Sequence, residues 1–195
     1  AQHFFTYNDT TSLEEAVKAA GDDLAAIFVS PFRHDVFQDQ LLPTRDFAVH
    51  CRELADRTGA MLVVDDVRGG FRVSRDCSWS TVGVQPDLSC WGKAIANGHP
   101  ISAVLGSDSA RAGAAAIFTT GSYWFAAAAM SASLATLKLV RETDYLERLN
   151  TVGDRLRGGL DERAKAAGFS IRQTGPSPLP QILFDGDPDF RFGYG

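Results

Sequence analysis

Met61-Leu-Val-Val-Asp65-Asp-Val67 is the stretch that decides the fold of this chain. Its four leading apolar residues predict a buried strand over 61–64, and this strand ends on an acid. A helical pattern over 47–55 precedes it, and a short apolar run over 24–29 precedes that helix. A strand, a helix and a second strand at this spacing form a βαβ unit, which implies a parallel sheet. We therefore predict an α/β fold.

Two more short strands are expected after this unit, over 87–91 and 101–106. Only nine residues separate them, which is short for a crossover helix, so the last strand is expected to run antiparallel. At the other end of the chain, Ser12-Leu-Glu-Glu15 has the spacing of a capping box and Gly21 is a helix stop, which predicts a first helix between them.

The C-terminal part of the chain is expected to be helical and then to begin a smaller α+β domain. We expect an Ala-rich helix over 122–140, an amphipathic helix over 145–167, and two strands over 169–172 and 181–184. Gly158-Gly159 is a weak point of the second helix because glycine has a low helix propensity. We place the domain boundary between residues 143 and 144.

Composition excludes several classes of protein. The 195 residues carry a net charge of −5, which does not suggest a nucleic-acid surface. No apolar run approaches the roughly 18 residues that a membrane span needs. The three cysteines form no C-x-x-C pair, and the four histidines show no metal-ligand spacing, so neither a disulfide framework nor a metal site is indicated. A reduced, cytoplasmic protein is expected.

Lys93 is the most informative basic residue. The other three lysines lie in expected helices, where a solvated face explains them, whereas Lys93 follows the expected strand over 87–91. Asp65 also stands at the carboxyl end of a strand, which is where parallel sheets bind ligands. A lysine that forms a Schiff base and an acid that pairs with a pyridine nitrogen are what pyridoxal 5'-phosphate requires. A plain surface lysine and a turn-capping Asp65 are the alternatives.

Two further features are open to more than one interpretation. Asp65 and Asp66 point to opposite faces of a strand, so one can face a ligand while the other makes structural hydrogen bonds. Phe118-Thr-Thr-Gly-Ser122 is expected to open the Ala-rich helix, where hydroxyl and N–H groups form an anion site. Ordinary N-capping by Ser122 or Thr120 is the alternative. His34 and His99 lie in expected loops, and nothing marks either as a base.

Two motifs together resemble the class III aminotransferases, in particular the branch of glutamate-1-semialdehyde aminomutase. Val63-Val-Asp65-Asp66-Val67-Arg-Gly-Gly70-Phe71-Arg72 is similar to the family's Asp-Glu-Val followed by Gly-Phe-Arg. Pro86-Asp87-Leu88-Ser-Cys-Trp-Gly92-Lys93-Ala-Ile-Ala-Asn-Gly98-His-Pro100 is similar to its lysine region. The separation of 28 residues between Asp65 and Lys93 (93 − 65) also matches the family.

The resemblance implies a role for four residues. Lys93 would form the Schiff base with pyridoxal 5'-phosphate, and Asp65 would pair with the pyridine nitrogen. Val67 would pack on the cofactor ring, and Thr119 would reach the cofactor phosphate of a neighbouring subunit, which implies a homodimer with a shared site. Residues 1–143 would then be the C-terminal half of the large domain of a fold type I enzyme, and residues 144–195 the beginning of its small domain. The chain is expected to be a fragment of a longer protein, inactive alone.

Three departures leave the substrate open. The family's Glu-Pro is Ser30-Pro31 here, and its Asp-Glu is Asp65-Asp66. Its Asn-Pro after Thr119 is replaced by aromatic residues, Tyr123 and Trp124, which we expect in the dimer interface. The expected function is an aminotransferase or aminomutase acting on an amino acid or amino-carbonyl compound. The alternatives are a racemase or epimerase of the same fold, a catalytically silent homologue, and an unrelated α/β domain with a chance motif.

Overall fold

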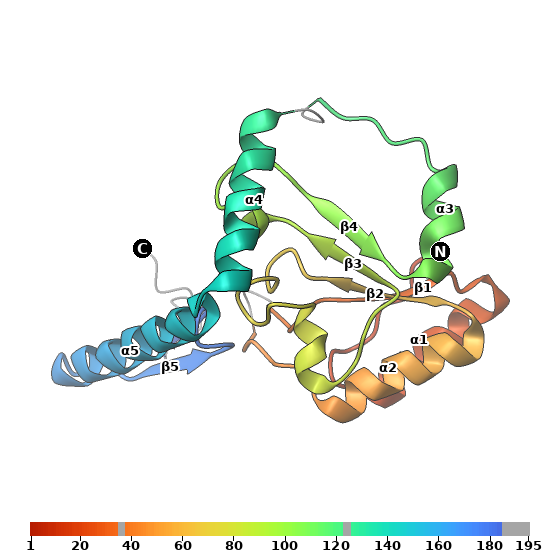
Figure 1. The fold of residues 1–195 in the computed structure, drawn as a ribbon. Coiled ribbons are helices and arrows are strands. Elements are labelled where there is room, and N and C mark those ends of the chain that lie inside the picture. Colours follow the sequence, from red (N-terminus) through yellow and green to blue (C-terminus); the bar gives the residue numbers. More distant parts are fainter. Residues whose placement is uncertain (35–37, 123–125, 185–195) are drawn as a thin grey trace.

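A four-stranded sheet forms the centre of the structure (Figure 1), a computed structural model that describes residues 1–34, 38–122 and 126–184. Its strands are β1 (Ala26–Val29), β2 (Met61–Asp65), β3 (Leu88–Trp91) and β4 (Ala103–Gly106), in that spatial order. β1, β2 and β3 pair in parallel, and β4 pairs antiparallel to β3. The predicted α/β fold and the antiparallel direction of the fourth strand are confirmed.

Helices α1 (Thr10–Ala20) and α2 (Arg45–Thr58) lie together beside the sheet (Figure 1). Both end at glycine, as expected for α1, and Gly59 takes the left-handed conformation (φ 73°) in which glycine is favoured. The capping-box prediction for α1 was wrong, because Asp9 is the N-cap and its side chain accepts a hydrogen bond from the Ser12 N–H. Asp9 is the N-cap because it precedes the first helical residue and its charged carboxylate accepts hydrogen bonds from the free N–H groups.

The core lies between α2 and the sheet. Helix α2 buries one face, which consists of Phe47, Ala48, Cys51, Leu54 and Ala55. Trp79 enters the core from the 3₁₀ helix η2 (Ser78–Val82) and meets the Phe47 ring edge-on, with 6.1 Å between ring centroids. Asp87 joins the layers, since its Oδ2 accepts hydrogen bonds from the Leu62 N–H and from Arg52, both at 2.8 Å.

The long helix after the sheet begins later than predicted. Helix α4 spans Ala127–Glu142, and the residues before it, 117–122, are exposed and form neither helix nor strand. The prediction that a helix starts near Ser122 was therefore wrong. Helices are stabilised mainly by burying one face, and α4 does so through Ala129, Ser133, Thr136 and Val140, whereas 117–122 bury nothing. A short helix, α3 (Arg111–Ala116), was not foreseen.

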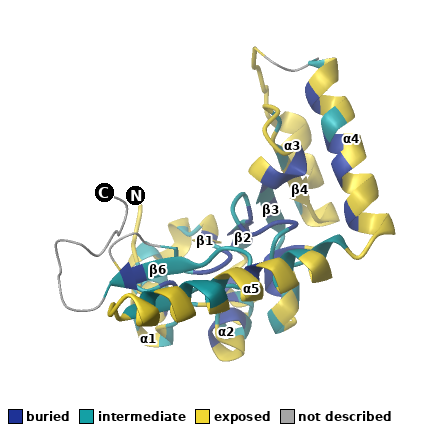
Figure 2. Ribbon diagram, turned by 90° about the vertical axis from the view of Figure 1, so that its left-hand side faces the viewer, coloured by how far each residue is buried: buried dark blue, intermediate teal, exposed yellow. Residues whose placement is uncertain are grey.

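The last elements form a separate layer. Helix α5 (Tyr145–Ala166) packs on an antiparallel hairpin of β5 (Ile171–Thr174) and β6 (Gln181–Phe184). Figure 2 shows α5 with a largely exposed outer face. The hairpin is tied to the loop after β1, because the Gln40 N–H donates to Thr174 Oγ1 at 3.0 Å and Arg172 pairs with Asp39. Within the described residues, no helix is long and apolar enough to cross a membrane.

Gly153 in α5 makes room for the backbone of the loop between β5 and β6. A Cβ atom at Gly153 would lie 2.3 Å from the Ser177 carbonyl oxygen, whereas Cβ atoms at Gly158 and Gly159 would meet nothing within 4 Å. Because the three glycines lie in one helix, alanine substitutions at them distinguish the effect of this packing contact from the effect of helix propensity.

We predict that Gly153→Ala destabilises the protein by roughly 1–3 kcal/mol, because the loop must move away from the helix. Gly158→Ala is the matched control and should stabilise it by up to about 1 kcal/mol, because alanine is the better helix former. Thermal unfolding measures both changes. A stabilising effect of Gly153→Ala would show that this contact is absent.

Candidate active site

Asp65 and Asp66 occupy different environments at the carboxyl end of β2. Asp65 is the last strand residue and is half-buried, and its Oδ1 accepts a hydrogen bond from the Val67 N–H at 3.2 Å. Asp66 is fully buried, and Ser78 donates to it from its N–H at 2.7 Å and from its hydroxyl at 2.5 Å. Burial raises the pKa of the Asp66 carboxyl, against the hydrogen bonds from Ser78, which lower it. The Asp66 carboxylate is thus engaged in structural hydrogen bonds, whereas Asp65 is partly accessible at the end of the strand.

The turn after Asp66 packs tightly on its surroundings. A Cβ at Gly69 would lie 2.5 Å from Ser78 Oγ and 2.7 Å from Asp66 Oδ1, and one at Gly70 would lie 2.6 Å from the Trp91 ring. Larger residues would push the turn off the sheet. Gly69-Gly70 therefore holds the chain beyond Asp66 against the end of β3.

Lys93 follows the carboxyl end of β3, separated from it by Gly92. Its backbone is left-handed, with φ 45°, a conformation that costs a non-glycine residue on the order of 1–3 kcal/mol. The surrounding turn is well anchored, since Ala94, Ile95 and Ala96 are buried and the Asn97 amide donates to Thr136 Oγ1 on α4 at 3.2 Å. Buried packing therefore fixes an uncommon backbone at the residue that carries the amine.

Val67 lies beside the Lys93 turn. A Cβ at Gly92 would come within 3.1 Å of Val67 Cγ1, so the valine side chain covers the residue directly before Lys93. Asp65 also pairs in register with Cys90, three residues before the lysine. The structure thus gathers Asp65, Val67 and Lys93 at one edge of β2 and β3.

Thr119 does not stand where the sequence predicted it. It lies in the exposed stretch between α3 and α4, and α4 begins eight residues later, at Ala127 (Figure 1). The proposed anion site at a helix N-terminus is therefore wrong for this residue, as is N-capping by Ser122 or Thr120, because Ala126 is the N-cap of α4. Tyr123 and Trp124 lie outside the described residues.

His34 follows β1 and was not selected from the sequence. Its ring meets the buried Phe32 ring edge-on, with 5.6 Å between centroids. Burial lowers the pKa of its imidazole, the positive charges of Arg68 and Lys93 lower it further, and the Asp65 carboxylate acts in the opposite direction. The rule that selected Asp65 and Lys93 was their position just beyond a parallel strand. His34 also follows such a strand, but four residues separate it from Val29.

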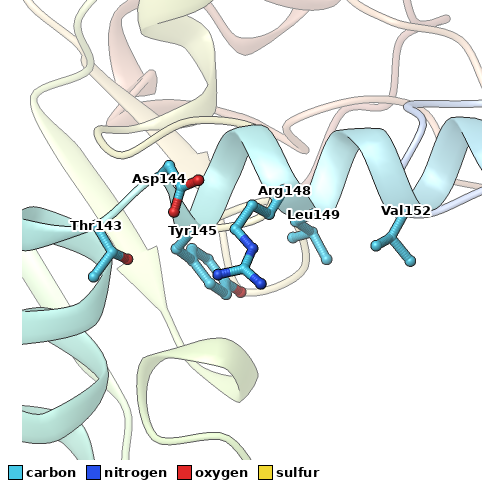
Figure 3. Close-up of a pocket in the computed structure, with 6 residues that line it drawn as sticks. All are labelled: Thr143, Asp144, Tyr145, Arg148, Leu149 and Val152. Atoms are coloured by element: carbon cyan, nitrogen blue, oxygen red, sulfur yellow. The ribbon is translucent and has the colours of Figure 1, made fainter.

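A hollow of about 350 Å³ elsewhere on the molecule is not part of this edge. It runs along the start of α5 and is lined by Thr143, Asp144, Tyr145, Arg148, Leu149 and Val152 (Figure 3). None of the candidate residues lines it. In the described part of the chain, no group of three or more His, Cys, Asp or Glu residues could hold a metal ion.

Comparison with known proteins agrees with these motifs. Residues 4–176 match the Aminotransferase class-III family. Aminopentol aminotransferase of Sphingopyxis macrogoltabida is 56% identical, over 98% of this chain and 45% of its own length. Glutamate-1-semialdehyde 2,1-aminomutase of Rhodopirellula baltica is 31% identical, over 94% and 42%. The chain therefore spans about half the length of these curated relatives.

A solved structure gives the same result for the fold. The pyridoxal phosphate internal aldimine form of the FumI protein of Sphingopyxis sp. MTA144 superposes with a TM-score of 0.93 at 56% identity. The superposition covers 98% of this chain and 46% of that one. The arrangement of β1 to β4 and the helices beside them is thus that of a pyridoxal phosphate protein.

Proposed function

Because this chain belongs to the class III aminotransferase family, we propose that the full-length protein moves amino groups on small amino compounds and that Lys93 and Asp65 are its central residues. The fold is that of fold type I, and pyridoxal 5'-phosphate is the cofactor of the family. One observation carries the assignment to these residues. Lys93 and the half-buried Asp65 stand at the carboxyl ends of adjacent parallel strands, and Val67 packs beside Gly92, directly before the lysine.

These residues fit the cofactor chemically. When bound, pyridoxal 5'-phosphate supplies an electron sink for negative charge at the substrate carbon. Lys93 would hold the cofactor covalently and then move a proton at that carbon. The Asp65 carboxylate would keep the pyridine nitrogen protonated, and Val67 would pack against the ring. Asp66 is unsuited to this work, because both of its contacts with Ser78 are structural.

Amino-group transfer is the first candidate reaction. Aminopentol aminotransferase, at 56% identity, supports transfer to a separate acceptor, and the aminomutase of R. baltica, at 31%, supports relocation within one molecule as the second candidate. The two differ in a simple requirement: transfer needs a keto-acid or aldehyde acceptor, whereas relocation proceeds without one. Turnover of an amino-carbonyl compound with and without added pyruvate separates them, because such a compound carries its own acceptor carbon.

We propose two domains for the whole protein, with the boundary at residues 143–144 as the sequence predicts. The two separate sheets and the start of α5 at Tyr145 support it.

We also propose that the protein is a homodimer in which Thr119 of one subunit reaches the cofactor phosphate of the other. The exposed Ile117 and Phe118 beside it support this, since they are 67% and 92% exposed in this chain. Sedimentation of the full-length protein should show a dimer or a dimer of dimers, and a fully active monomer would contradict the shared site.

Lys93 should carry the cofactor. Borohydride reduction of the full-length protein, followed by peptide mapping, should place the pyridoxyl group on Lys93. Lys93→Ala should abolish turnover with the fold intact, and Lys138→Ala, on α4, is the matched control that should retain both labelling and turnover. Pyridoxyl label on a different lysine would sink this assignment. The full-length protein is required because we expect the 195-residue chain alone to be inactive.

A further inference from the structure

The backbone of Lys93 is held by hydrogen bonds from the residues that follow it. Its carbonyl oxygen accepts from the Ala96 N–H at 3.3 Å and from the Asn97 N–H at 3.0 Å. Lys93 itself is exposed, whereas Ala94, Ile95 and Ala96 beside it are buried. The direction in which the lysine side chain leaves the turn is therefore set by this hydrogen-bonded backbone.

Asn97 closes the turn in the same left-handed conformation as Lys93. The φ angle of Asn97 is 44° and that of Lys93 is 45°. Asparagine is several-fold enriched in this region among the residues other than glycine, because its short polar side chain tolerates it. Lysine has no such advantage, so Lys93 is the strained member of the pair and depends on its surroundings to keep this backbone.

Thr136 connects the turn to helix α4. The Asn97 side-chain amide donates to Thr136 Oγ1 at 3.2 Å, and Thr136 is 8% exposed, on the buried face of α4. Because the backbone N–H of the same asparagine donates to the Lys93 carbonyl, two hydrogen bonds in series join the helix to the lysine. An asparagine that served only the left-handed backbone would not need a partner 39 residues away.

We propose that Asn97 and Thr136 are positioning residues that hold Lys93 in its left-handed backbone and so aim its amine at the cofactor aldehyde. Helix α4 is a fixed support for this purpose, since Thr136 is buried together with Val140, one helical turn later. Both residues act through the Lys93 peptide and not on the reacting atoms themselves. This inference rests on the proposed function, because it assigns supporting residues to the lysine of that site.

The test follows covalent attachment of pyridoxal 5'-phosphate to the full-length protein after its cofactor has been removed. The neutral lysine amine attacks the aldehyde carbon, and the aldehyde oxygen leaves as water with both amine hydrogens. Visible absorbance at one fixed pH gives the rate of this step at increasing cofactor concentration. The maximal rate reports how well the amine is placed, and the half-saturating concentration reports how tightly the cofactor binds beforehand.

Three variants separate the hydrogen bond from the left-handed backbone. Thr136→Val removes the hydroxyl at nearly constant volume, and Asn97→Gly removes the amide but keeps a residue suited to a positive φ. Each should lower the maximal rate roughly tenfold and leave the half-saturating concentration unchanged, because a misplaced amine slows the reaction and not the binding. Thr136→Ser keeps a hydroxyl and should retain most of the wild-type rate.

A double variant tests whether both residues act through the same hydrogen bond. Thr136→Val combined with Asn97→Gly should be no slower than the slower single variant, because the bond can be lost only once. Thr151→Val is the matched control, since that hydroxyl donates to the Glu147 carbonyl of its own helix at 2.9 Å. It should leave both the maximal rate and the half-saturating concentration unchanged.

An unchanged maximal rate in Thr136→Val and Asn97→Gly would overturn the proposal, as would losses that multiply in the double variant. A change in the half-saturating concentration alone would also overturn it. If Thr136→Val does not fold, Asn97→Gly decides, because Asn97 is exposed and the variant removes only the amide. Failure of Lys93 in the wild-type protein to take up the cofactor would instead overturn the proposed function, and this inference with it.

Discussion

Parallel pairing of β1, β2 and β3 is the constraint on which the rest of the structure depends. Parallel strands all end at one edge of the sheet, so the residues that follow them meet there. The pairing is stabilised by a continuous apolar core, in which Leu62 and Val64 of β2 are fully buried beneath α2. Any slip of β2 by one residue would exchange these side chains with their neighbours and would exchange the environments of Asp65 and Asp66.

The strained backbone at the site is held in place by the buried residues around it. Lys93 and Asn97 both have left-handed backbones, and the three residues between them are buried. The Asn97 amide joins this turn to Thr136 on α4, so α4 stabilises the Lys93 turn from outside the sheet. Gly69 and Gly70 serve the turn after β2, where Asp66 and the Trp91 ring leave no room for a Cβ atom. The turn after β2 is fixed by close packing on its glycines and holds Asp66, which precedes it. The Lys93 turn is fixed by its buried residues and holds Lys93, which begins it.

Sequence patterns predicted the parts of the fold that depend on local periodicity. The apolar run from Met61 and the helical spacing of Phe47, Cys51 and Leu54 both encode burial, and the structure buries them as expected. The start of α4 was misjudged because burial of one face decides where a helix forms, and α4 buries Ala129 and residues beyond it, whereas Ser122 is exposed. His34 was missed for a different reason. The charges of Asp65 and Lys93 act on the pKa of His34, but it lies in an irregular loop, which no periodicity describes.

The central claim is that Asp65 faces the cofactor while Asp66 holds the fold. The most direct measurement is turnover and denaturant unfolding of Asp65→Asn and Asp66→Asn in the full-length protein. Asp65→Asn should cripple turnover because the amide would no longer keep the pyridine nitrogen protonated. The unfolding free energy should change little, because the hydrogen bond that the half-buried Asp65 carboxylate accepts within the described residues comes from nearby Val67. Asp66→Asn should lose roughly 1–3 kcal/mol of stability and retain turnover per folded molecule, because one Ser78 donor loses its acceptor. Equal catalytic loss from both substitutions would contradict the account.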